Sequence, residues 1–123
     1  MFILKWGDWW MCTRNELGTI LDEIAKSYRA AYGDDLFKIL LYGSYARGDF
    51  CDDSDIDIAA IVRGSRQDLQ DKLKQVWERA NDLELEYETL VSPTVIPLDE
   101  YERYKKDVPY YSNIEKEGIL LNR

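Results

Sequence analysis

The segment spanning residues 36–62 constrains the fold most, because it predicts two strands joined by a tight turn and a polar loop. Residues 37–42 form a nearly continuous apolar run, as in a buried strand, and Gly43-Ser44 ends it. The second strand begins with alternating aspartate and isoleucine and then becomes wholly apolar. This period of two places Asp55 and Asp57 on the same side of the strand. Neighbouring carboxylates repel each other unless a cation lies between them, so we predict a magnesium site here.

Composition limits the classes of function. A length of 123 residues fits one domain, and the net charge of −8 argues against direct nucleic-acid binding through phosphate neutralisation. The chain has no histidine, which excludes imidazole catalysis and His-ligated zinc. Only two cysteines are present, Cys12 and Cys51, so we expect a reducing, cytoplasmic location. No apolar run approaches the ~20 residues of a membrane span, so no membrane association is expected.

The first ten residues are unusual because three of the four tryptophans lie there. Met11 follows, and Thr13 with Glu16 has the spacing of a capping box that starts a helix. Two interpretations fit: a non-native start with Met11 as the natural first residue, or an aromatic arm that docks on the domain or on a partner. We therefore expect an N-terminal extension at 1–10 and a folded domain at 11–123.

Hydrophobic periodicity predicts the remaining elements. A spacing of three and four residues indicates helices, and strict alternation indicates strands. Read in this way, the sequence predicts a helix over 14–32, a helix from Ser65 to about 82, a strand over 83–91, a short edge strand at 94–96, helices over 99–106 and 112–117, and a closing apolar segment at 119–121.

The Gly43-Ser44 turn has the chemistry of a phosphate site. Gly43 allows the backbone to bend sharply after a strand, and Ser44 offers a hydroxyl and free amides at the start of a helix. Arg47, one helical turn later, adds a cation. A Gly-Ser pair or an Asp-x-Asp pair alone is a weak signal. Together, at the ends of two strands, they would place a phosphate-binding site and a metal-binding site close enough to contact the same nucleotide.

These residues also carry a resemblance to a known family. Gly43-Ser44, ten residues, and then Asp55-Ile56-Asp57 resemble the signature of the DNA polymerase beta-like nucleotidyltransferase superfamily. The string Tyr-Gly-Ser-Tyr-Ala-Arg-Gly-Asp at 42–49 is similar to its minimal nucleotidyltransferase (MNT) branch, and the resemblance extends from about Met11 to the end. It implies an α+β, two-layer fold with a mixed, mostly antiparallel sheet of about four strands and helices mainly on one face.

The resemblance implies a mechanism for the two motifs. Asp55 and Asp57 would hold two Mg²⁺ ions that clamp the triphosphate of the substrate ATP and stabilise in-line displacement at the α-phosphorus. Ser44 would hold the distal phosphates, with Gly43 providing the turn.

In the family, a third carboxylate on the next strand usually assists the catalytic metal and takes the proton of the acceptor hydroxyl. Alternation over 83–91 would place three candidates, Glu84, Glu86 and Glu88, on one side of that strand. We expect Glu86, the central one, to be this catalytic and metal-binding residue, with Glu88 second. The alternative is that all three simply face solvent, which would leave a protein that only binds.

The resemblance also implies a partner. Proteins of this branch are commonly encoded beside a HEPN-family ribonuclease toxin, act as its antitoxin, and can transfer AMP from ATP to a toxin tyrosine. Two alternatives remain: an antitoxin that neutralises the toxin by binding alone, and transfer of a nucleotide to a small molecule. Enzymes of the latter kind add a helical domain that helps to form the acceptor site. A chain of 123 residues that fits one domain leaves no room for a helical domain of that kind. We therefore expect the acceptor to come from another molecule, either a protein partner or another copy in a homo-oligomer.

Overall fold

The computed structural model describes residues 14–51 and 54–122. The N-terminal extension expected at 1–10, and the capping box beginning at Thr13, lie outside the described residues. The elements run in the order α1 (Arg14–Tyr32), the 3-10 turn η2 (Gly33–Asp35), β1 (Leu36–Tyr42), α2 (Ser44–Arg47), β2 (Asp55–Val62), α3 (Arg66–Tyr87), β3 (Leu90–Pro97), α4 (Leu98–Tyr104), α5 (Pro109–Glu117) and β4 (Ile119–Asn122).

The four strands form one mixed sheet in the order β3-β2-β1-β4. β1 pairs antiparallel with both β2 and β4, whereas β2 and β3 are parallel. The parallel pair requires a long crossover, which α3 provides. The expected α+β fold with a mostly antiparallel sheet is therefore confirmed.

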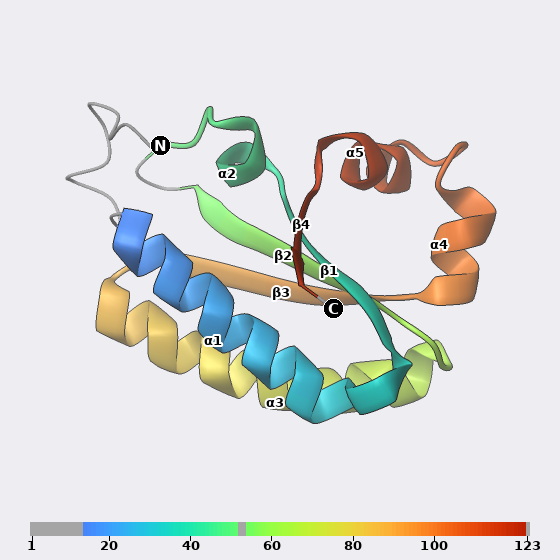
Figure 1. Cartoon of the computed structure of the whole chain (residues 1–123), viewed down its shortest axis with the longest axis horizontal. Coiled ribbons are helices and arrows are strands. Elements are labelled where there is room, and N and C mark those ends of the chain that lie inside the picture. Colours follow the sequence, from blue (N-terminus) through green and yellow to red (C-terminus); the bar gives the residue numbers. More distant parts are fainter. Residues whose placement is uncertain (1–13, 52–53, 123) are drawn as a thin grey trace.

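The two long helices cover one face of the sheet (Figure 1). Ile20, Ile24 and Tyr28 of α1 pack with the inward residues of α3 against Ile56 and Ile58 of β2, and all of them belong to the main core cluster. The hydroxyl of Tyr28 is buried in this layer and donates to the carbonyl oxygens of Ile58 and Thr94. This larger layer fixes the position of β2, the strand that begins with Asp55.

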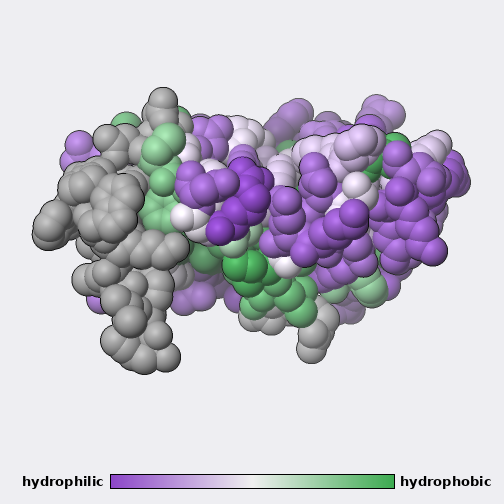
Figure 2. Space-filling model, turned by 90° about the horizontal axis from the view of Figure 1, so that it is seen from above, coloured by the Kyte–Doolittle hydropathy of each residue, from purple (hydrophilic) through white to green (hydrophobic). Residues whose placement is uncertain are grey.

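The opposite face is covered at one end only, by α4 and α5 (Figure 1). A second, smaller cluster lies beneath them and comprises Leu40, Ala59, Ile61, Ile96, Tyr101 and Ile114. Seen from above, the α4–α5 end of the molecule is mostly hydrophilic on its outside (Figure 2). Asp55 and Asp57 share the sheet face of Ala59 and Ile61 because strand residues two apart point the same way. Since the two long helices, α1 and α3, cover one face and the short helices α4 and α5 cover only part of the other, the prediction that helices lie mainly on one face is confirmed.

The predicted strand over 83–91 is wrong. α3 continues to Tyr87, and β3 begins only at Leu90. Alternation and helical spacing coincide in this segment, and burial shows which one governs it: Leu83 is buried on the core side of α3, whereas Leu85 is exposed. Glu88 then ends the helix in the left-handed region, at φ 52.

β3 also corrects the predicted edge strand at 94–96, which in fact spans eight residues from Leu90 to Pro97. Pro93 lies inside it, opposite Ile58 of β2. A proline is tolerated there because β3 lies at the edge of the sheet, where a missing N–H need not break the ladder. Among the described helices, none is both long enough and apolar enough to cross a membrane.

Candidate nucleotide and metal site

Gly43 and Asp57 are in direct contact, and this contact joins the two motifs. Gly43 follows β1 with φ 77, in the region that favours glycine. A Cβ atom placed on it would lie 2.4 Å from Oδ2 of Asp57, closer than real contacts permit. Any side chain at position 43 would therefore displace the carboxylate. The turn before α2 and the start of β2 meet at this point, as the spacing of the motifs predicts.

Asp55 and Asp57 form a carboxylate pair on the same face of β2. Asp55 is exposed, whereas Asp57 is half-buried. Burial and the negative charge of Asp55 raise the pKa of Asp57, while Arg47 acts in the opposite direction. The raised pKa means that the fold holds the ionised Asp57 at a cost, which a bound cation would offset.

Arg47, at the end of α2, is held by two carboxylates. Its Nε donates to Asp49 at 3.1 Å, and its Nη1 donates to Glu117 of α5 at 3.2 Å. Hydrogen bonds to Asp49 and then Glu117 raise the pKa of the guanidinium. Arg47 therefore lies beside the pair, ties α2 to α5, and is the cation whose charge counteracts the raised pKa of Asp57.

The three glutamates do not lie on a strand, so the reasoning that favoured Glu86 is wrong. Glu86 is exposed near the end of α3. Burial, and then the charge of Glu86 and a hydrogen bond with it, raise the pKa of the neighbouring Tyr87 hydroxyl. Because α3 covers the sheet face opposite to that of Asp57, the structure does not bring Glu86 to the carboxylate pair. Glu84 accepts a hydrogen bond from the backbone N–H of Val91 at 2.9 Å, and Glu88 caps the helix.

The strand that does lie beside the pair has no acid. In the parallel register, Leu90 is opposite Asp55 and Ser92 is opposite Asp57, and the sequence of β3 is Leu-Val-Ser-Pro-Thr-Val-Ile-Pro. Within residues 14–51 and 54–122, no group of three or more acidic or cysteine side chains is close enough to hold a metal ion. The described part of the site is therefore a two-carboxylate arrangement with a serine at its side.

Tyrosines from α5 and β1 border the pair. Tyr42 is the cross-strand neighbour of Asp57, and its hydroxyl shares a hydrogen bond of 3.0 Å with the hydroxyl of Tyr110. Burial, the contact with Tyr110 and the charge of Asp57 raise the pKa of Tyr42. The ring of Tyr110 meets that of Tyr42 edge to face, with centroids 6.0 Å apart, and remains half-exposed. Tyr42 and Tyr110 thus form an aromatic wall next to the carboxylates.

The family model for the nucleotidyltransferase domain matches residues 21–121, which include both motifs, strands β1 to β3 and all of β4 except its last residue. The chain belongs to the nucleotidyltransferase domain family. A protein of Methanocaldococcus jannaschii named "Putative protein adenylyltransferase MJ0141" is 32% identical over 106 residues, covering 85% of this chain and 97% of the relative.

Solved structures share the fold of this nucleotidyltransferase at low sequence identity. One, described as "Structure of putative minimal nucleotidyltransferase", has a TM-score of 0.55 and 19% identity, covering 87% of this chain and 94% of its own. Another, "Crystal structure of the toxin-antitoxin with AMP-PNP", has a TM-score of 0.50 and 21% identity, covering 81% and 70%. These two likenesses show the shared fold, and the family model confirms the nucleotidyltransferase resemblance found in the sequence.

Sequence reasoning missed two features of this nucleotidyltransferase site. The place of Ser92 beside Asp57 was not predicted, because Ser92-Pro93 looks like a break between two strands. The alternation from Leu90 onward, however, indicates one continuous strand. The place of Tyr110 could not be predicted, because only the fold brings α5 over β1. Tyr42 is the last residue of the first predicted strand, and its pairing with Asp57 follows once the register between β1 and β2 is known.

Proposed function

We propose that this nucleotidyltransferase transfers AMP from ATP, with magnesium, to a tyrosine hydroxyl of a partner protein, a toxin of the HEPN family. The contact between Gly43 and the carboxylate of Asp57 carries the proposal. It joins a turn suited to phosphate oxygens to a carboxylate pair suited to a cation, and nucleoside triphosphate transfer requires both together.

The carboxylates fit magnesium by the chemistry of their donors. Mg²⁺ is commonly held by one or two carboxylates, waters and the phosphates of a substrate, rather than by a complete protein cage. Asp55 and Asp57 supply this number of ligands, and burial together with the charge of Asp55 raises the pKa of Asp57, so a cation would stabilise its ionised form. When bound, magnesium would neutralise charge on the triphosphate and polarise the α-phosphoryl group.

The chain's own residues then have distinct roles. The backbone and hydroxyl of Ser44 bind the distal phosphates, and Gly43 allows their close approach. Arg47 adds a positive charge at the same end of the site, with its orientation fixed by Glu117. These contacts orient the α-phosphorus toward the incoming acceptor oxygen.

In the transfer step, the tyrosine oxygen bonds to the α-phosphorus, and the bond from that phosphorus to the bridging oxygen breaks. Pyrophosphate leaves, and the hydroxyl proton passes to water. Because β3 has no acid, we assign no protein base to this proton. A phenol, with an ordinary pKa of about 10, keeps its proton at neutral pH, but the proton becomes strongly acidic as the oxygen bonds to phosphorus, so water can then accept it.

The choice of a protein acceptor is supported by the relatives. The name of the M. jannaschii relative states protein adenylyltransferase. The structural neighbours include a toxin–antitoxin complex with AMP-PNP, an ATP analogue, and a "toxin-antitoxin MntA-HpeT" mutant. A shared fold with such complexes makes a toxin the first partner to test.

One observation favours a second function, neutralisation of the toxin by binding alone. The third carboxylate expected beside the pair is absent from β3, where Ser92 occupies the position opposite Asp57. A site that binds ATP weakly and transfers no AMP would still leave a folded surface able to block a toxin.

The test is incubation of the protein with ATP, Mg²⁺ and a candidate HEPN-family toxin from the same organism, followed by mass spectrometry of both chains. We expect AMP-sized increments on a tyrosine of the partner, lost on chelation of the metal and in Asp55→Asn. A partner that is silenced without any increment would establish neutralisation by binding instead.

A further inference from the structure

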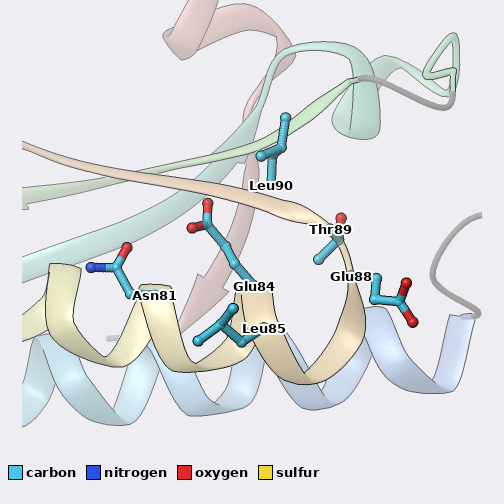
Figure 3. Close-up of a pocket in the computed structure, with 6 residues that line it drawn as sticks. All are labelled: Asn81, Glu84, Leu85, Glu88, Thr89 and Leu90. Carbon is cyan, nitrogen blue, oxygen red and sulfur yellow. The ribbon is translucent and has the colours of Figure 1, made fainter.

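The outer surface of α3 and its turn into β3 carry two adjoining hollows of similar size. One, of about 470 Å³, is lined by Asn81, Glu84, Leu85, Glu88, Thr89 and Leu90 (Figure 3). The other, of about 460 Å³, lies around Trp77, one helical turn before Asn81, and shares Asn81 with the first. Together they form a continuous surface along the helix, which we call the α3 groove.

Large apolar side chains are exposed along the α3 groove. Leu85 is 83% exposed, Leu90 is 49% exposed and Trp77 is 39% exposed. All three line the hollows rather than standing singly on a convex surface. Exposed apolar side chains gathered in a concavity are typical of interaction surfaces, and tryptophan is among the residues that contribute most to binding.

The charged side chains that line the α3 groove are mostly negative. Four carboxylates line it, Asp71, Glu78, Glu84 and Glu88, and the one basic lining residue, Lys74, already lies 3.7 Å from Asp71. The combination of exposed leucine and tryptophan with an acidic rim is complementary to a basic segment that carries apolar side chains.

The α3 groove ends next to the carboxylate pair. Leu90 is the register partner of Asp55 in the parallel ladder, so it points to the same face of the sheet. Figure 3 shows Leu90 on the far side of β3 from Glu84 and Asn81. Since β3 is an edge strand, a chain lying in the groove can pass around this edge without crossing another strand.

We propose that the α3 groove docks a basic amphipathic segment of the acceptor protein and so delivers its hydroxyl to Asp55 and Asp57. The proposal rests on the transfer function proposed above and names the surface that selects the acceptor. Trp77 and Leu85 bind the apolar side of the segment, the carboxylates bind its cations, and Leu90 marks where it reaches the site.

The first test uses a synthetic 18-residue amphipathic helix with leucines on one face and lysines on the other, and a control peptide with glutamines in place of the lysines. NMR titrations of the isotopically labelled protein at physiological salt locate the binding surface. We expect the largest shift changes at Trp77, Leu85 and Leu90, and much weaker binding of the control peptide. Shift changes centred elsewhere, or equal affinity for both peptides, would overturn the proposal.

Variants then separate this surface from exposed apolar residues in general. Leu85→Lys should weaken peptide binding at least tenfold without loss of packing, because the side chain is 83% exposed. Trp77→Ala should do the same, whereas Phe37→Ala and Leu120→Ala are matched controls at 40% and 49% exposure outside the groove. Equal losses in the controls would refute a specific surface.

ATP binding by the same variants distinguishes the two proposals. Leu85→Lys should bind ATP and Mg²⁺ like the wild type, since Leu85 lies on the helix layer and not at the carboxylate pair. With the partner protein, its AMP transfer should fall through a higher KM for the partner at an unchanged KM for ATP. Transfer unaffected by Leu85→Lys would overturn the docking surface and leave the transfer function standing, whereas a wild type without transfer would overturn the latter.

Discussion

The two halves of the sheet face that carries Asp57 differ in whether their polar side chains have favourable partners. Between α4 and α5, partly buried hydroxyls have partners: Tyr101 donates to Glu115, and Tyr111 donates to Glu100, which also pairs with Arg66. At the other half, Asp55 and Asp57 repel each other, and the pKa of Asp57 is raised. One half is arranged for stability, and the other retains a charge conflict that a ligand can relieve.

The electrostatic directions support this contrast. Hydrogen bonds from Tyr111 and Arg66 lower the pKa of Glu100, and the bond from Tyr101 lowers that of Glu115, so both carboxylates are stabilised in the ionised form. Burial and a like charge do the opposite to Asp57. The same functional group, a carboxylate, is therefore favoured in its ionised form over one half of the sheet and disfavoured in that form over the other.

Of the substitutions considered, Asp57→Asn should have the largest effect, because it should nearly abolish transfer without lowering the stability of the fold. Loss of one of two metal-ligand charges should reduce AMP transfer by about a thousandfold or more, equivalent to about 4 kcal/mol of transition-state stabilisation. Without metal, the variant should be at least as stable as the wild type at neutral pH, because a half-buried, repelled charge has been removed. Transfer rates and thermal melts measure the two effects on one preparation.

A matched control for Asp57→Asn is Asp99→Asn, an exposed aspartate in the first turn of α4. It should leave transfer unchanged. If Asp57→Asn instead lowered the metal-free stability by more than 1 kcal/mol, the half of the sheet assigned to function would also be structural.

Tyr101→Ala should have the largest effect on the stabilising half. Tyr101 is fully buried in the smaller cluster with Ile61 and Ile96, and large-to-small changes of aromatic core residues cost about 3–5 kcal/mol. Denaturant unfolding measures the loss. Tyr104→Ala on the same helix is the control, since its side chain is 38% exposed, and a cost comparable to that of Tyr101→Ala would contradict this account.

Tyr101→Phe isolates the hydroxyl and should have a smaller, pH-dependent effect. The bond to Tyr101 lowers the pKa of Glu115 from its ordinary 4.5, so its contribution is present above that value and is lost as the pH falls through the folded pKa. We expect a loss of about 0.5–1 kcal/mol at pH 7, reduced by the solvent exposure of Glu115. Unfolding curves of the two proteins should converge in acid, and a constant difference at all pH values would rule out this bond as the cause.

Much of the fold and half of the site follow from the sequence, because local pattern and tertiary structure agree there. The helix over 14–32, the hairpin of β1 and β2, and the meeting of Gly43 with Asp57 all rest on periodicities that the core enforces. The segment after residue 80 differs, because its apolar residues satisfy both a strand and a helix. Only packing against α1 and the sheet selects the helix, so Ser92 takes the place beside Asp57 that we assigned to a glutamate.

Glu86→Gln provides the smallest and most decisive change. If Glu86 lay on a strand beside the pair, the substitution would remove a general base and cut the transfer rate by about a hundredfold or more. The structure instead exposes it on α3, on the other side of the sheet, where surface substitutions change stability by about 0.5 kcal/mol or less. We therefore expect unchanged kcat and KM for ATP, measured with the partner in excess. A large fall in kcat with normal ATP binding would mean that α3 unwinds in the active complex and that the strand indicated by alternation is the catalytic form.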